Sequence, residues 1–329
     1  MTSDNIPASS SKPLVSAIIA TYNRGYIVCE AIDSIINQTY KETEIIVVDD
    51  GSTDDTQEQL RQYGSRIRIV SQNNSGPAAA WNAGIKAARG SIICFLGSDD
   101  VYLPNFVERH VSALEKAGPA VPCSLGNALT RWADGRQTSS FELARLRPPL
   151  EEGLWLNALD VFLTRFVMCG QMWAIRREVL DRIGLFDVTL RYLEDYDIGV
   201  RLALEGPWAY VREPIVEFRQ STTGDSLSLS ISSEDPRLHM YMLKIRTRLA
   251  DLMKARVPAM HSRYLGMAIG KAKRDIWALG QKNASSQLVR HSVSAYKKIE
   301  HYYLALFERS PFYPKMNVIP YGELCRSQR

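Results

Sequence analysis

The sequence has few cysteines, and none of them is placed as metal sites or disulfide frameworks require. Its 329 residues include five cysteines, no two of which are spaced as Cys-x-x-Cys. Structural zinc sites and small disulfide-rich folds need clustered cysteines, so neither is indicated here. Scattered thiols in odd number are typical of a reducing compartment, so we expect a cytoplasmic protein. The five are Cys29, Cys94, Cys123, Cys169 and Cys325.

Long hydrophobic runs are also missing. The longest apolar stretch, 154–175, is interrupted by Asn157, Asp160 and Arg165. Charged residues inside a membrane span are costly, so we expect no segment to cross a bilayer. Residues 1–12 are polar and rich in serine, without the basic-then-apolar pattern of a signal peptide, and we expect them to be a disordered leader.

Two glycine-rich phosphate-binding motifs are absent. No Gly-x-Gly-x-x-Gly follows the first apolar segment, and Gly-x-x-x-x-Gly-Lys-Ser/Thr occurs nowhere. This disfavours dinucleotide cofactors and P-loop chemistry. Any phosphate would then be held by a metal ion and side chains, which suits a nucleoside diphosphate that serves as a leaving group.

An apolar segment that ends in two acids stands out among the features present. Residues 92–100 read IICFLGSDD, which predicts a buried strand ending at Asp99 and Asp100. Ligands bind at the carboxyl ends of strands in open α/β sheets, and a divalent cation makes adjacent carboxylates tolerable. On this segment alone, a solvated turn explains the pair equally well.

Strand and helix patterns alternate through the first hundred residues. Apolar strand segments at 14–20, 44–48 and 66–71 are followed by helical patterns at 27–38, 54–60 and 78–88. This order predicts right-handed βαβ units and a mostly parallel sheet flanked by helices. The loops after the first, second and fourth strands should therefore meet at one edge, where they could hold a nucleotide.

Three stretches together resemble a known family. They are residues 15–53, the stretch QNNSGPAAAWNAGIKAARGSIICFLGSDD, and Leu193-Glu194-Asp195-Tyr196-Asp197. In their order and spacing they are similar to the family 2 inverting glycosyltransferases, whose fold is GT-A, and the similarity spans roughly residues 13–230. It implies an α/β fold, transfer of a sugar from a nucleotide-sugar donor to an acceptor hydroxyl, and inversion at the anomeric carbon in a single displacement.

The resemblance also implies roles for individual residues. Asp195 matches the general base of the family, and Asp100 matches its ligand for Mg²⁺ or Mn²⁺, although Gly97 stands where a further Asp is frequent. Asp99 would reach the ribose or a metal-bound water, and Asp50 would accept a hydrogen bond from the nucleobase. Residues assigned to the nucleotide or donor are Thr21, Tyr22, Asn23, Arg24, Asp50, Asn82 and Asp99.

Four further residues are candidates with ordinary structural alternatives. Gly170, Gln171 and Glu194 are predicted on the acceptor side, and Arg219 is predicted to contact the diphosphate. Glu194 also suits a charge in the first turn of a helix, where the dipole favours acids, and the same reading applies to Asp195 without the resemblance. An arginine at a strand end is more often solvated or salt-bridged.

The C-terminal part has a different charge balance. Between Arg237 and Arg309 there are 15 Lys or Arg and four acids, so this part carries +11 and the rest of the +4 chain carries −7. Apolar residues at helical spacing predict that residues 231–329 form an α-helical extension after the catalytic domain of residues 13–230. It could pack on the catalytic domain or a second subunit, or bind anionic lipid headgroups as a peripheral contact at the inner face of the membrane. No nucleic-acid partner is expected.

Together with these features, the resemblance implies a metal-dependent inverting glycosyltransferase of surface polysaccharide or glycolipid assembly, with a UDP- or dTDP-sugar favoured as donor and a glycan or lipid-linked acceptor. The alternatives are a nucleotide-sugar-binding scaffold with degenerate catalysis and a sugar-nucleotide nucleotidyltransferase. The sequence leaves the oligomeric state open, a homo-oligomer included.

Overall fold

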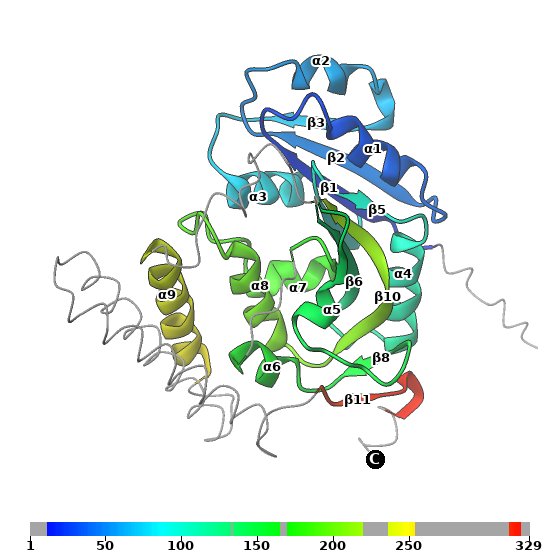
Figure 1. Ribbon diagram of the computed structural model, residues 1–329, viewed down its shortest axis with the longest axis vertical. Helices are drawn as coiled ribbons and strands as arrows, with labels where there is room; N and C mark the ends of the chain where they lie inside the picture. Colours follow the sequence, from blue (N-terminus) through cyan, green and yellow to red (C-terminus); the bar gives the residue numbers. More distant parts are fainter. Residues whose placement is uncertain (1–11, 133, 165–169, 220–235, 254–315, 324–329) are drawn as a thin grey trace, which may run out of the picture.

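The computed structural model describes residues 12–132, 134–164, 170–219, 236–253 and 316–323, which contain one eleven-stranded sheet (Figure 1). The strands are β1 (Val15–Thr21), β2 (Thr43–Asp49), β3 (Arg68–Ser71), β4 (Ile92–Gly97), β5 (Val101–Tyr102), β6 (Cys123–Arg131), β7 (Gln137–Ser139), β8 (Glu152–Trp155), β9 (Trp173–Arg176), β10 (Trp208–Arg219) and β11 (Val318–Ile319). Their order is β11-β8-β10-β6-β9-β4-β1-β2-β3, with β5 paired to β10 and β7 to β6.

Helices flank the sheet, as an α/β fold requires. They are α1 (Val28–Ile36), α2 (Thr56–Arg61), α3 (Pro77–Ala87), α4 (Phe106–Ala117), α5 (Ser140–Leu143), α6 (Ala158–Thr164), α7 (Arg177–Ile183), α8 (Glu194–Ala203) and α9 (Pro236–Met253), with 3-10 turns η1 (Gly64–Arg66) and η2 (Tyr321–Glu323). None of the helices in these described residues is long and apolar enough to cross a membrane.

The N-terminal half of the sheet is parallel. β1 pairs in parallel with both β2 and β4, and β2 pairs in parallel with β3. Every residue of β4 is buried, which explains why its sequence is a run of apolar residues without alternation. This half confirms the βαβ units predicted from the sequence.

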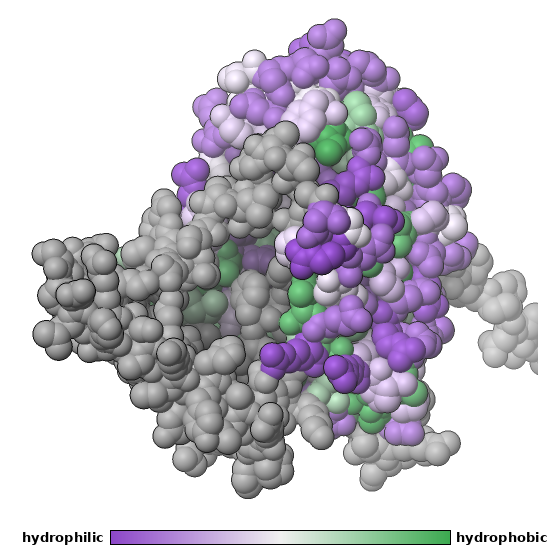
Figure 2. Space-filling view, in the orientation of Figure 1, coloured by the Kyte–Doolittle hydropathy of each residue, from purple (hydrophilic) through white to green (hydrophobic). Residues whose placement is uncertain are grey.

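The other half of the sheet is mixed. β9 lies antiparallel between β4 and β6, and β10 runs parallel to β6 but antiparallel to β8 and β5. An aromatic cluster packs against α8 in the core. The cluster consists of Trp155, Phe162, Trp173, Tyr196 and Trp208. On the face seen in Figure 2, hydrophilic residues predominate and hydrophobic ones form only small groups.

The described residues of the predicted C-terminal extension contact the rest of the chain in two places. Helix α9 lies beside α8 (Figure 1), with Ile245 and Leu249 each 2% exposed. The short strand β11 pairs antiparallel with β8, so residues 318–319 are strand and not helix. The helices predicted within 254–309, and the lipid-binding surface proposed for them, lie outside the described residues, as does most of the predicted leader.

Candidate active site

Polar loops from β1, β2 and β4 meet at one edge of the sheet. The register pairs Thr21 with Asp49, and Ala20 with Gly97, so the residues that follow these strands are close together. The Thr21 side chain is buried, and its Oγ1 has no hydrogen-bond partner among the residues that the structure describes. An unpaired buried hydroxyl is costly, so this atom is suited to receive a ligand. The neighbouring Tyr22 ring is 46% exposed at the same edge.

The loop after β1 is held against the loop after β2. Asn23 adopts a left-handed backbone conformation with φ 51°. Its Oδ1 accepts a hydrogen bond from the Thr53 N–H at 2.8 Å, and its own N–H donates to Ser52 Oγ at 2.9 Å. Asn23 therefore joins the two loops by hydrogen bonds, and its predicted contact with the donor stays a prediction.

Asp50 is buried and accepts three hydrogen bonds within the chain. Gln72 Nε2 donates at 2.7 Å, the Ser75 N–H at 2.9 Å and the Gly76 N–H at 2.8 Å. A carboxylate has about four acceptor positions, so one remains for a nucleobase. Sequence reasoning missed Gln72, although its place just after the parallel strand β3 could have indicated it.

Asp99 and Asp100 converge on the small space above Gly97. A Cβ at position 97 would lie 3.0 Å from Asp99 Oδ1, 3.0 Å from Asp100 Oδ2 and 2.7 Å from Gln171 Nε2. Since both carboxylate oxygens are 3.0 Å from one point, they are at most about 6 Å apart. Burial, together with the Asp99 charge, raises the pKa of Asp100 well above its ordinary value.

Two arginines stand beside this acidic pair. Arg24 Nη2 lies 3.8 Å from Asp99 Oδ2, and its side chain is 12% exposed. The Arg219 N–H donates to Asp100 Oδ1 at 2.9 Å. The Arg219 guanidinium itself pairs with Glu30 and lies 3.5 Å from Glu217. Arg24 thus supplies positive charge at the acidic pair, whereas Arg219 would have to leave Glu30 to bind a diphosphate.

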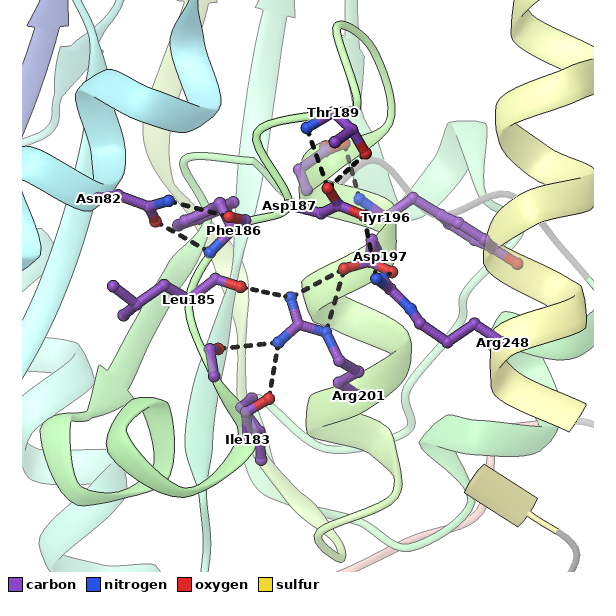
Figure 3. A network of polar contacts seen from close by, with 12 residues as sticks. Asn82, Ile183, Leu185, Phe186, Asp187, Thr189, Tyr196, Asp197, Arg201 and Arg248 are labelled. Atoms are coloured by element: carbon purple, nitrogen blue, oxygen red, sulfur yellow. Dashed lines mark hydrogen bonds and ion pairs between the residues drawn. The ribbon is translucent and has the colours of Figure 1, made fainter. Parts of the chain in front are cut away.

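Asn82 connects helix α3 to the segment before α8. Its Nδ2 donates to the Phe186 carbonyl at 2.9 Å, and its Oδ1 accepts from the Phe186 N–H at 2.9 Å (Figure 3). Most of the amide is therefore engaged by main chain, which leaves one N–H for the donor contact that the sequence predicts.

Glu194 and Asp195 begin helix α8. Asp195 Oδ1 accepts from the Tyr196 N–H at 2.7 Å, and Oδ2 accepts from the Gly170 N–H at 3.2 Å. Glu194 is half-buried, and its desolvation raises its pKa to about 8, with a further contribution from the charge on Asp195. The residue before them, Leu193, has φ 65°, a strained conformation for a bulky side chain.

Gly170 and Gln171 approach both pairs of acidic residues, Glu194–Asp195 and Asp99–Asp100. Gly170 donates to Asp195, and the side chain of Gln171 lies above Gly97, beside Asp99 and Asp100. The structure thus brings the residue predicted as a base and those predicted as metal ligands close to the same dipeptide. This arrangement can hold a charged donor beside a proton acceptor.

Comparison with known proteins identifies the chain. Residues 16–184 match the sequence profile of Glycosyl transferase family 2. The chain belongs to this family. An uncharacterized glycosyltransferase of Rickettsia prowazekii is 33% identical over 228 residues, which are 68% of this chain and 70% of that protein. The EpsJ glycosyltransferase of Bacillus subtilis is 33% identical over 61% of this chain and 62% of its own length, whereas the match with a Rickettsia felis relative covers only 39% of that protein.

Solved structures confirm the GT-A type of fold for this glycosyltransferase. Residues 1–349 of TarS from S. aureus, in complex with UDP-GlcNAc, superpose with a TM-score of 0.62 and 17% identity, covering 84% of this chain and 77% of TarS. The mannosyltransferase PcManGT from Pyrobaculum calidifontis, in complex with GDP-Man and Mn²⁺, gives 0.54 and 18%, covering 88% and 81%.

The acidic pair of the glycosyltransferase fits a divalent cation. Mg²⁺ is commonly bound by one or two carboxylates, with substrate phosphates and water as its other ligands. Asp99 and Asp100 present carboxylate oxygens to one point. Burial and then the Asp99 charge raise the pKa of Asp100, so a bound cation would favour its ionised form. The described residues contain no group of three or more potential ligands, so substrate or water would complete the set.

Proposed function

We propose that this glycosyltransferase moves a sugar from a nucleoside-diphosphate sugar, favoured as UDP or dTDP, to an acceptor hydroxyl with inversion and with help from Mn²⁺ or Mg²⁺. The observation that carries the proposal is that Gly170 donates to Asp195, while the side chain of the next residue, Gln171, converges with Asp99 and Asp100 above Gly97. It supports an anionic donor at Asp99 and Asp100 and an acceptor beside Asp195.

The residues would divide the reaction between them. An alcohol is a weak nucleophile, so Asp195 would take its proton as the new bond to the anomeric carbon forms and the bond to the diphosphate breaks. The Gly170 N–H fixes one oxygen of Asp195 and leaves that carboxylate facing the dipeptide. Asp99 and Asp100 would hold the metal, which when bound neutralises charge on the departing diphosphate.

The remaining residues would bind the nucleotide. Thr21 offers an unpaired buried hydroxyl, Asp50 one free acceptor position, and Arg24 a largely buried cation near Asp99. Relatives include EpsJ and several uncharacterized glycosyltransferases. The acceptor we propose is a glycan or lipid-linked glycan in surface polysaccharide or glycolipid assembly, made in the cytoplasm or at the inner face of the membrane.

The first test is thermal stability with UDP, dTDP, GDP or CMP, each with and without Mn²⁺. A ligand at 100 times its dissociation constant stabilises the folded state by about 2.7 kcal/mol, or roughly 2–4 °C for each kcal/mol in a domain of this size. We expect one diphosphate to shift the melting temperature, and only with metal. Failure of every nucleotide would contradict the donor site.

The second test is transfer by two variants. Asp195→Asn should lose about 10²–10⁴-fold in kcat while keeping the nucleotide shift, because a general base contributes that much. Asp100→Asn should lose the metal-dependent shift itself. Glu178→Gln, which removes an exposed acid from the first turn of α7, is the matched control and should behave as wild type. Nucleotide binding without turnover in the wild type would favour the scaffold alternative.

A further inference from the structure

The segment 183–189, between α7 and α8, is held from three helices at once (Figure 3). From α3, Asn82 grips the Phe186 main chain in both directions, as described above. From α8, the Arg201 guanidinium donates to three consecutive carbonyls. These belong to Ile183 at 2.9 Å, Gly184 at 2.8 Å and Leu185 at 2.9 Å. Helix α3 leads into β4 and the acidic pair, so this segment links the donor side of the site to α8.

The third helix is α9, from the C-terminal extension. Arg248 Nη1 lies 3.0 Å from Asp187 Oδ2, and Lys244 Nζ lies 3.2 Å from the same oxygen. Burial opposes ionisation of Asp187, but hydrogen bonds from Thr189 and the charge of Lys244 outweigh it and lower its pKa to about 2. Asp187 is therefore charged at neutral pH and gives α9 a fixed anchor.

Arg248 alone of these two cations also reaches α8. Its Nη2 contacts Asp197, whose side chain is only 2% exposed. Arg201 completes the pairing of Asp197, with Nη2 at 2.8 Å and Nε at 3.0 Å from Oδ2. Removing Arg248 would leave Asp197 Oδ1 without its ion pair and Arg201 as the remaining cation, which weakens a buried charge pairing. Arg248 thus pairs with the first turn of α8 at Asp197, which is two residues from Asp195.

Apolar contacts hold α9 in the place that this pairing needs. Ile245 and Leu249, one turn apart and next to Lys244 and Arg248, are both buried. Tyr241, one turn earlier, faces Tyr192 with ring centroids 6.4 Å apart. The charged and apolar contacts of α9 therefore fall on one side of the helix, and that side faces α8 and the segment before it.

We propose that Arg248 is a positioning residue for Asp195, so that helix α9 of the extension belongs to the catalytic unit. Arg248 does not touch substrate: it acts by pairing Asp197 and Asp187, which sets the first turn of α8 against the donor side of the site. The assignment of Asp195 as base rests on the proposed function, whereas the structural coupling of Arg248 to α8 does not.

The test compares Arg248→Met with Lys244→Met in the full chain. Both variants remove a cation that pairs with Asp187, but only Arg248 also pairs with Asp197. We expect Arg248→Met to lower kcat at least tenfold with little change in KM for the donor, and to speed hydrogen exchange of the amides at 194–198. Lys244→Met should change each by less than threefold, and Arg248→Lys should recover part of kcat.

The outcomes separate this inference from the proposed function. If Arg248→Met leaves exchange at 194–198 unchanged, the inference is overturned whatever the activity. Equal losses of kcat in Arg248→Met and Lys244→Met would also overturn it, because the contact with Asp197 would then have no distinct effect. If Asp195→Asn retains full transfer, the proposed base is wrong, but faster exchange in Arg248→Met would still support its coupling to α8.

Discussion

Glu194 and Asp195 are adjacent carboxyl groups with different surroundings. Asp195 accepts hydrogen bonds from two main-chain N–H groups, which favour its ionised form. Glu194 is half-buried, and desolvation raises its pKa to about 8. At neutral pH Glu194 is therefore expected to be mainly protonated. A proton acceptor beside a neutral neighbour suits the proposed reaction better than two repelling charges.

Glu194→Gln should flatten the dependence of stability on pH. The folded-state pKa of Glu194 lies above the unfolded value, so its stabilising contribution is complete below about pH 4.5 and is lost as pH rises through about 8. The neutral variant lacks that loss. The melting temperature of Glu194→Gln minus that of wild type should therefore increase from pH 5 to pH 8 and then level off. A difference in melting temperature that is constant across this range would show that desolvation does not raise the pKa of Glu194.

Side-chain contacts between residues far apart in the sequence were the least predictable part of the site. The place of Asp99 and Asp100 at the end of a buried strand could be predicted from adjacent residues, whereas Asp195 was predicted as a base only through the family resemblance, and the roles of all three stay predictions. The contact of Asn82 with main chain could not be predicted, since its partner Phe186 is 104 positions away and is brought close only by the fold. The same holds for Arg219 and Glu30, which are 189 positions apart. Local sequence indicates residue chemistry but not whether that chemistry is already satisfied within the chain.

Helix α8 carries Asp195 and packs closely on the aromatic cluster below it. Gly199, in the middle of α8, faces this cluster. A Cβ there would lie 2.9 Å from Phe162 and 2.9 Å from Trp173, closer than real contacts allow. The glycine therefore permits the close approach of α8 to the core, at the expense of helix propensity.

Gly199→Ala should be destabilising even though alanine favours helices. The gain in propensity is roughly 0.5–1 kcal/mol, whereas overpacking a core typically costs about 1–3 kcal/mol. We expect a net loss of stability and, because α8 must shift, a fall in kcat larger than the fall in donor affinity. Thermal melts, nucleotide titration and transfer kinetics would check this. A higher melting temperature with unchanged kcat would mean that the aromatic side chains move to accommodate the new methyl group without loss of packing.

The parallel strands were predictable as elements, and the mixed half of the sheet was not. β1, β2 and β4 are buried on both faces, so their sequences are apolar runs that differ clearly from the helices between them. β8 and β9 have four residues each, too few to show a period. β11 has only two, and its pairing depends on β8, far away in the sequence.

At the scale of the whole molecule, the chain returns to its own sheet near the C-terminus. β11 pairs Val318 with Trp155 and Ile319 with Leu154 on β8. Two more hydrogen bonds extend this contact. The Leu156 N–H donates to the Asn317 carbonyl at 2.8 Å, and the Asn317 N–H donates to Asn157 Oδ1 at 2.7 Å. β11 therefore covers an edge of β8 that would otherwise present unpaired main-chain groups.

Removing residues 316–329 should lower stability without weakening the donor site. Each lost hydrogen bond costs about 0.5–1.5 kcal/mol, so we expect a total of a few kcal/mol and a fall of several degrees in melting temperature. Light scattering should show more association, because the uncovered edge of β8 can pair with another chain. The metal-dependent nucleotide shift should persist, since β11 lies at the opposite end of the strand order from β1 and β2.

Gly153→Ala tests the same contact without shortening the chain. A Cβ at Gly153 would lie 2.7 Å from the Ile319 carbonyl oxygen, so alanine must push β11 away from β8. If β11 protects the sheet edge, this substitution and the deletion should lower the melting temperature in the same direction, and their combination should add little. Additive losses would show instead that Gly153 matters for its contact with Tyr210, whose ring carbon would lie 3.4 Å from the new Cβ.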